Sequence, residues 1–158
     1  MNINWYCKAF NNLVPAELYQ VMRLRSEVFV VEQNCVFLDA DNKDEQCLHF
    51  MDWIEKDLVA YTRLSPPGYI YNEPSIGRVV TSPAYRKNKI GYVLMKKSIE
   101  QCRKIFGDAP IKIGAQYYLK NFYASFGFKQ ISDIYLEDGI EHIYMLLSWS
   151  DASKASDQ

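Results

Sequence analysis

The stretch that decides the fold is Ile76-Gly77-Arg78-Val79-Val80-Thr81, followed after a short break by Arg86-Lys87-Asn88-Lys89-Ile90-Gly91. The first part is rich in β-branched residues and predicts a strand, which Pro83 ends. The second part is a basic turn that leads into a helix, and the backbone N–H groups of a helix start attract anions. Together the two parts indicate a pyrophosphate site. The simpler alternative is that the cations only solvate a loop while Gly91 eases helix packing.

The residues after this turn predict an amphipathic helix and then another strand. Apolar residues recur at helical spacing and end at a glycine, and they are Ile90, Val93, Leu94, Cys102, Ile105 and Gly107. The short apolar run Ile111 to Ala115 follows. Because a helix connects them, strands 76–81 and 111–115 are expected to run parallel.

The rest of the chain predicts a mixed sheet with helices on its faces. Seven further segments complete the order β-α-β-β-β-α-β-α-β-β: a strand over 2–10, a helix from Pro15 to Phe29, a hairpin of 47–54 and 58–64, a short helix over 120–126, and a second hairpin of 128–136 and 142–149. The acidic residues of 34–45 predict a solvated connection. We expect one domain over residues 1–150 and a flexible tail over 151–158.

Composition excludes several classes of protein. A chain of 158 residues with 49% hydrophobic and 23% charged residues is long enough for one folded domain and is not disordered. A formal net charge of −1 gives no field that would hold nucleic acid or an anionic membrane. The longest apolar run, Ile143 to Leu147, is far below the roughly 20 residues of a membrane span. Residues 1–5 show no signal peptide, so we expect a cytoplasmic protein.

Metal and thiol chemistry are not expected. The four cysteines form no C-x-x-C pair, and two histidines allow no zinc-binding spacing. We therefore predict no metal site and treat the cysteines as small hydrophobic residues.

A second motif lies downstream, in Asn121-Phe122-Tyr123-Ala124-Ser125-Phe126-Gly127-Phe128. With it the chain resembles the GNAT-superfamily N-acetyltransferases. Arg86-x-x-Lys89-x-Gly91 is similar to their pyrophosphate pattern Arg/Gln-x-x-Gly-x-Gly/Ala and departs from it only at Lys89. Their later signature is matched by Asn121, Tyr123, Gly127 and Phe128. Four further segments, 25–33, 76–79, 114–116 and 138–142, resemble the ElaA-type subfamily, and the resemblance covers residues 3 to 147.

The resemblance implies a fold, a cosubstrate and a site. The fold is α/β (α+β), a GNAT-like mixed central sheet of about seven strands flanked by helices, with a splayed parallel strand pair at its centre. The cosubstrate is acetyl-CoA, with direct transfer of acetyl to a primary amine. The implied CoA-binding residues are Val79, Val80, Thr81, Arg86, Lys87, Asn88, Lys89, Ile90, Gly91, Tyr92, Asn121 and Tyr123. A backbone N–H in a bulged strand, around Val79 to Thr81, is implied to bind the oxyanion, and Tyr123 to act as general acid.

The acceptor side is less determined. Candidates for the base are Glu32, His49, Asp52, Glu141 and His142, with ordered water as the alternative. We expect Glu32 to hold the substrate ammonium and His142 to act as base or on the substrate side. Arg25 either pairs with Glu32 or covers the core with its stem. The loop from Ser65 to Pro74, with two tyrosines, is expected to be a mobile substrate lid.

Two other functions stay open. A non-catalytic acyl-CoA-binding or sensing module would keep the pyrophosphate loop without turnover. An acyl-homoserine-lactone-synthase-like enzyme is suggested because Arg25-x-x-Val28-Phe29 followed by Glu32 is similar to the first helix of that family. The acceptor is a small amine, a polyamine, or a peptide or protein amine, and a homodimer is the default assembly.

Overall fold

The computed structural model describes residues 2–150 of the chain. Its strands are β1 (Asn4–Ala9), β2 (Leu48–Ile54), β3 (Asp57–Ser65), β4 (Ser75–Thr81), β5 (Ile111–Gln116), β6 (Lys129–Gln130), β7 (Tyr135–Glu137) and β8 (Ile140–Leu147). Its helices are α1 (Pro15–Arg25), the π-helical segment η2 (Ser26–Glu32), α2 (Ile90–Phe106) and α3 (Lys120–Ala124), with short 3-10 turns at 10–12, 44–46, 83–85 and 117–119. The expected tail over 151–158 lies outside the described residues.

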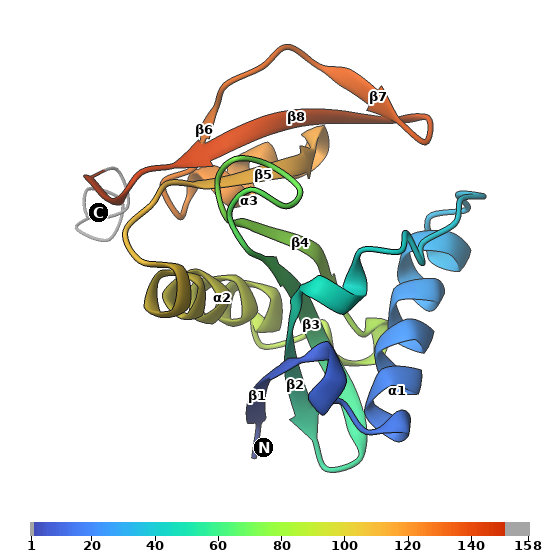
Figure 1. Cartoon of the computed structure of the whole chain (residues 1–158). Coiled ribbons are helices and arrows are strands. Elements are labelled where there is room, and N and C mark those ends of the chain that lie inside the picture. The colour runs from blue at the N-terminus through green and yellow to red at the C-terminus, as the bar shows by residue number, and fades with distance from the viewer. Residues whose placement is uncertain (1, 151–158) are drawn as a thin grey trace.

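The strands form two sheets that part at the centre of the molecule (Figure 1). One sheet has the antiparallel order β1-β2-β3-β4, and in the other β8 pairs with β5, β6 and β7. At their start β4 and β5 are joined by the Lys112 N–H, which donates to the Pro74 carbonyl at 3.1 Å. No ladder pairs the two strands beyond that point within residues 2–150. The predicted splayed strand pair at the centre is confirmed.

The second sheet contains one strand more than we expected. Residues 128–136 form two short strands, β6 and β7, instead of one. Between them the Tyr144 N–H donates to the Ser132 hydroxyl at 2.9 Å, so a side chain takes the place of the backbone acceptor and interrupts the ladder.

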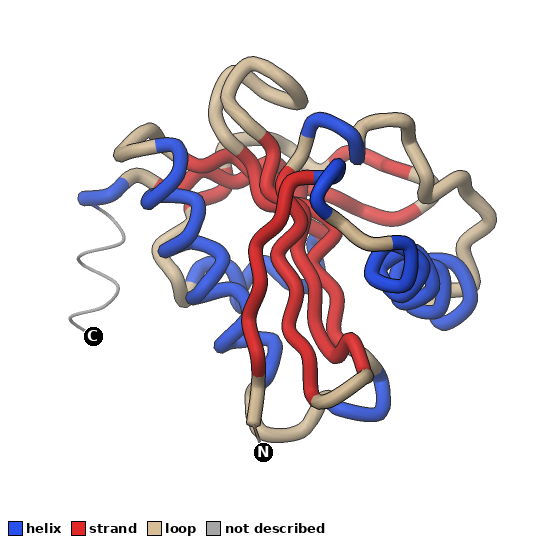
Figure 2. The backbone as a smooth tube through the Cα atoms, turned by 60° about the horizontal axis from the view of Figure 1, so that its bottom comes forward, coloured by secondary structure: helices blue, strands red, loops and turns tan. Residues whose placement is uncertain are grey.

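Two helices cover opposite faces of the first sheet (Figure 2). Leu94, Met95 and Cys102 of α2 belong to a core that spans both sheets. Val21 and Leu24 of α1 pack in a smaller core on the other face. The core packed against α2 therefore joins the two sheets, although no ladder of backbone hydrogen bonds connects them within residues 2–150.

The first helix is longer than its apolar periodicity predicted. Pro15 begins α1, and the Glu17 carboxylate accepts a hydrogen bond from the Val14 N–H at 2.9 Å. Beyond Arg25 the same helix continues as the π-helical segment η2 to Glu32. π-Helical turns of this kind are frequent at functional sites.

The prediction of a solvated connection over 34–45 was wrong for Asp39 and Asp44, although Glu45 is exposed. Asp39 and Asp44 are 5% and 9% exposed. The Arg25 guanidinium, fully buried, donates to Asp39 Oδ2 at 2.8 Å and to Asp44 Oδ1 at 2.7 Å. Burial by itself raises the pKa of Asp44, but hydrogen bonds and charge from Arg25 and Arg63 outweigh it and hold the pKa below its usual value.

Candidate functional site

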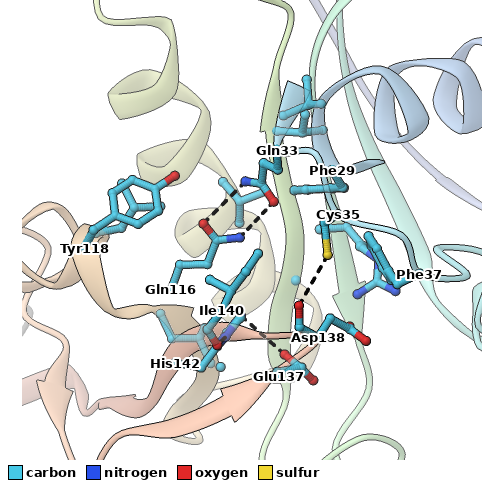
Figure 3. A pocket seen from close by; sticks show the side chains of 18 of the residues that line it. Phe29, Gln33, Cys35, Phe37, Gln116, Tyr118, Glu137, Asp138, Ile140 and His142 are labelled. Atoms are coloured by element: carbon cyan, nitrogen blue, oxygen red, sulfur yellow. Dashed lines mark hydrogen bonds and ion pairs between the residues drawn. The ribbon is translucent and has the colours of Figure 1, made fainter. Parts of the chain in front are cut away.

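A cavity of about 660 Å³ opens where β4 and β5 diverge. Its walls come from β4, β5, η2, the segment after η2, and the turn between β7 and β8 (Figure 3). Such a crevice between strands is a common place for a ligand in an α/β fold.

Six of the twelve expected CoA-binding residues line this cavity, and they are Val79, Val80, Thr81, Arg86, Gly91 and Tyr123. The other six lie beside it. Lys87, Asn88 and Lys89 are exposed on the loop, and Asn121 is exposed on α3. Ile90 is buried in the core, and Tyr92 stacks on Phe126 with ring centroids 4.9 Å apart.

The loop before α2 has the backbone of an anion site. Asn88 and Lys89 have left-handed φ values of 67° and 57°, and Lys89 is the N-cap of α2. Consecutive residues in such turn conformations direct N–H groups into one concavity. Lys89 thus adopts the conformation that a glycine would adopt most easily. The cations of Arg86, Lys87 and Lys89 surround this helix start, so the residues present fit a pyrophosphate.

Strand β4 carries a bulge at the cavity. Tyr61 pairs with Val80 while Arg63 pairs with Gly77, so β4 has one more residue than β3 between these two pairs. Arg78 lies in the bulge with a φ of 50°. The bulge expected around Val79 to Thr81 is present, and it begins one residue earlier.

Tyr123 lies at the floor of the cavity and is 6% exposed. Its ring is edge-on to Phe122 and Phe128, with centroids 5.2 and 6.1 Å away. Burial raises the pKa of its phenol above the ordinary value. The hydroxyl therefore keeps its proton at neutral pH and is suited to donate it.

Glu32 and Arg86 form an ion pair across the mouth of the cavity. Glu32 Oε1 and Oε2 accept from Arg86 Nη2 and Nη1 at 2.6 and 2.9 Å. Both side chains are about two-fifths exposed, at 40% and 42%. The expectation that Arg25 pairs with Glu32 was wrong, because its guanidinium binds the carboxylates of Asp39 and Asp44. The alternative that its stem covers the core agrees with the full burial of the side chain.

His142 lies at the opposite side of the cavity from the loop and is 8% exposed. Its Nδ1 is 2.8 Å from the Ile140 carbonyl, which can only accept, so Nδ1 carries the proton. In the neutral ring Nε2 then holds the lone pair, 3.3 Å from Glu137 Oε2 (Figure 3). An imidazole with this tautomer can accept a proton at Nε2.

Three other candidate bases lie outside the cavity. His49 is buried between the Tyr61 hydroxyl at 2.7 Å and the Asp44 carbonyl at 2.9 Å, and burial lowers its pKa. Asp52 is buried on β2, and Glu141 is exposed on β8. Each of the three belongs to a strand, but none of them lines the cavity.

The expected lid does not cover the cavity. None of residues 65–74 lines it. Tyr71 packs edge-on against Tyr144 at 5.7 Å, and Lys112 lies 4.8 Å above the Tyr71 ring. The loop is attached to the sheet of β5 and β8, so this prediction was wrong.

The sequence did not single out several residues that line the cavity. Gln33 and Gln116 exchange two amide hydrogen bonds of 3.4 and 3.2 Å and so join η2 to β5 (Figure 3). The Cys35 thiol donates to the Asp138 carbonyl at 3.5 Å, and the Phe37 ring lies beside it. Gln33 and Gln116 lie within the ElaA-type segments, but a single glutamine in a sequence does not by itself indicate a functional role.

Residues 2–150 contain neither a membrane-spanning helix nor a cluster of metal ligands. No helix there is long and apolar enough to cross a membrane. No group of three or more His, Cys, Asp or Glu side chains in that range could hold a metal ion.

Comparison with known proteins agrees with this geometry. Residues 14–149 match the family model of the acetyltransferase (GNAT) domain. Protein ElaA of Escherichia coli is 41% identical over 145 residues, which cover 90% of this chain and 95% of ElaA. The crystal structure of Escherichia coli ElaA superposes with a TM-score of 0.87 at 40% identity, covering 93% of this chain and all of that one.

Two further solved structures are similar. An acyl-CoA N-acyltransferase from Pseudomonas aeruginosa has a TM-score of 0.89 at 37% identity, over 93% of this chain and all of that chain. A GNAT family acetyltransferase from Elizabethkingia anophelis, solved with acetyl-CoA bound, shares the fold at a TM-score of 0.62 and 14% identity, over 93% of this chain and 98% of that one.

Proposed function

Since the chain belongs to the GNAT acetyltransferase family and is an acyltransferase, we propose that it moves the acetyl group of acetyl-CoA directly to a primary amine. The observation that carries this proposal is one cavity that brings together the loop before α2, the bulge of β4 and the Tyr123 side chain. These parts come from three separate segments, and each suits a different step of acyl transfer.

The cosubstrate is acetyl-CoA, which the Elizabethkingia anophelis neighbour holds in its crystal structure. Its pyrophosphate is bound by the N–H groups at the start of α2 and by the cations of Arg86, Lys87 and Lys89. Gly91 lines the cavity there, and an added Cβ would meet only Thr81 Cγ2 at 3.8 Å. Space for a phosphate therefore remains even beside a small side chain.

The reaction is an attack of the neutral amine on the thioester carbonyl carbon. A C–N bond forms, the C–S bond breaks, and the negative charge that passes through the carbonyl oxygen is stabilised by N–H groups of the β4 bulge. Tyr123 gives its proton to the leaving thiolate. No cysteine is placed in a matching position, so no acyl-enzyme intermediate is invoked.

The proton of the amine needs an acceptor, since an ordinary alkyl ammonium has a pKa near ~10.4. We assign this role to His142 Nε2, because the Ile140 carbonyl holds the proton of the ring on Nδ1. Glu137 stabilises the imidazolium that forms. Glu32, at the cavity mouth, attracts the cationic acceptor. The acceptor itself is a small-molecule or peptide amine.

The test is calorimetric titration of CoA and acetyl-CoA into the purified chain, together with thiol release from acetyl-CoA in the presence of a panel of amines. The panel contains tyramine, spermidine and a dipeptide with a free N-terminus. We expect binding of both ligands and amine-dependent thiol release. Binding without release by any amine would leave the non-catalytic module as the function, and no binding of either ligand would refute the CoA site.

A further inference from the structure

Arg78 has a backbone conformation that an arginine seldom adopts. Its φ is 50°, in the left-handed region, although it stands within strand β4. Glycine, asparagine and aspartate adopt this region with least strain. Gly77 is the preceding residue, yet its φ is not positive. The strained position of the bulge is therefore occupied by Arg78, which has a large side chain, and not by the neighbouring Gly77.

The Arg78 side chain is held from three sides. Its Nε lies 2.8 Å from Asp39 Oδ1, and its Nη2 donates to the Asp39 carbonyl at 3.0 Å. Nη2 also lies 3.4 Å from Asp41 Oδ2, and the guanidinium is 5.9 Å from the centre of the Phe37 ring. These contacts reach Nε and Nη2 of the guanidinium and join the bulge of β4 to residues 37–41.

Its partners are themselves fixed. Asp39 accepts from the buried Arg25 through Oδ2 at 2.8 Å and through its carbonyl at 3.1 Å. Asp41 accepts two hydrogen bonds of 2.8 Å from Arg63. Asp44 joins the two arginines, at 2.7 Å from Arg25 and 3.0 Å from Arg63. The network thus connects α1 and β3 to the bulge, and a charge in it cannot move without leaving another one unpaired.

We propose that Arg78 is a positioning residue for acyl transfer: its ion pairs with Asp39 and Asp41 hold residue 78 in the left-handed conformation and so aim the N–H groups of the bulge at the thioester carbonyl. This inference rests on the proposed function, because it needs an acyl-CoA in the cavity. The three carboxylates of 39–44 then serve the reaction through the backbone of β4.

The test varies the side chain at one position. Arg78→Ala and Arg78→Lys lose the forked contacts and keep a Cβ that disfavours left-handed φ. Arg78→Gly and Arg78→Asn lose the same contacts but adopt that φ readily. The readout is the ratio of the dissociation constants of CoA and acetyl-CoA, since only acetyl-CoA carries the carbonyl. The carbonyl stretching frequency of bound acetyl-CoA labelled with carbon-13 gives a second readout of the same hydrogen bond.

We expect Arg78→Ala and Arg78→Lys to lower the preference for acetyl-CoA by about 3- to 10-fold, the worth of one hydrogen bond, with CoA affinity little changed. Arg78→Gly and Arg78→Asn should keep at least threefold more of the preference than Arg78→Ala, and the carbonyl frequency should follow the same order. Arg78→Lys keeps a cation beside the carboxylates, so it supplies the comparison with glycine even where Arg78→Ala does not fold.

A merely structural role for Arg78 predicts a different pattern. All four variants would lose melting temperature while the ratio of dissociation constants and the carbonyl frequency stayed at their wild-type values, and that result would overturn the inference. Equal losses of preference in the glycine and alanine variants would overturn it as well. Failure of the wild type to bind either ligand would instead refute the proposed function.

Discussion

The two walls of the cavity are built in different ways. The wall that we propose for CoA, the CoA wall, comes from one continuous stretch, residues 79–91, which ends at the start of α2. The acceptor wall comes from η2, from residues 35–43, from the end of β5 and from the start of β8. Its side chains are held by an ion pair, an amide pair and a buried network of charges. A wall formed by neighbouring residues can be identified from the sequence. A wall formed by side chains that are far apart in the sequence can be identified only once the chain is folded.

The largest effect on turnover is expected from a substitution of Tyr123, which lines the cavity that the two walls enclose. Tyr123→Phe keeps the aromatic packing against Phe122 and Phe128 and removes only the proton donor. We expect kcat to fall by roughly 10²–10⁴ with little change in CoA affinity, measured by steady-state thiol release and calorimetry. Tyr6→Phe, on the exposed edge strand β1, is the control. Unchanged turnover in Tyr123→Phe would remove this residue as the acid.

The backbone character of the CoA wall is tested at Gly91. Gly91→Glu introduces a bulky carboxylate beside the expected pyrophosphate and should weaken CoA binding by more than about 100-fold. Gly91→Ala is the matched control, since its Cβ meets only Thr81 Cγ2 at 3.8 Å, and should bind CoA within about threefold of the wild type. Wild-type affinity in Gly91→Glu would place the pyrophosphate elsewhere.

On the acceptor wall, His142→Gln keeps a donor toward the Ile140 carbonyl and removes the basic nitrogen. We expect kcat at neutral pH to fall by about 10–10² and the loss to shrink at high pH, where the amine deprotonates unaided. A pH profile of kcat checks both. The comparison is His49→Gln, which should lower the melting temperature and leave kcat within about twofold. A large loss of kcat in His49→Gln, with kcat unchanged in His142→Gln, would assign the role of base to His49 instead.

The substitution Glu32→Gln tests whether loss of the Glu32–Arg86 ion pair affects CoA binding at one wall and amine binding at the other. An exposed ion pair contributes only about 0.2–1 kcal/mol, so CoA affinity should change by less than about threefold. The KM of a cationic amine should rise by about 3- to 10-fold, measured with Glu45→Gln as an exposed control. An equal KM for the amine would assign Glu32 a structural role only.

The smallest functional effect is expected at Asp52, an acid outside both walls. Its carboxylate is fully buried without a hydrogen-bond partner, and burial raises its pKa to about 7 although Lys97 opposes the shift. The neutral acid is favoured in the folded state, so this group adds stability below about pH 4 that is lost as the pH rises toward 7.

Asp52→Asn removes that titration. We expect the free energy of unfolding of the variant to gain on the wild type by about 1–2 kcal/mol between pH 4.5 and pH 7.5, with kcat and CoA affinity unchanged. Urea unfolding at the two pH values measures the gain, with Asp133→Asn as the exposed control. A constant difference at both pH values would mean that Asp52 ionises normally.

Sequence patterns were sufficient where structure is local. The basic turn and the helix after it, the bulged strand, the Asp138-Gly139 hairpin and Tyr123 were all placed from short segments. Errors arose where partners are far apart in sequence. Arg25 and Asp44 are 19 residues apart, and Gln33 and Gln116 are 83 apart. Asp39, Asp41 and Asp44 looked solvated because their arginine partners lie far along the chain or on other elements, on α1, β3 and β4.

By itself the sequence determined the alternation of strands and helices, the basic turn before α2 and the likeness to the GNAT acetyltransferases, because these depend on backbone propensities and on residues close together in the chain. Only the tertiary structure decided which candidate acids and bases reach the cavity and what holds Arg78 in its conformation. Glu32 and His142 line the cavity, while His49, Asp52 and Glu141 do not. The physical reason is that the divergence of the two sheets decides whether a side chain reaches the cavity and how deeply it is buried. That divergence is set by packing between elements that are distant in the sequence.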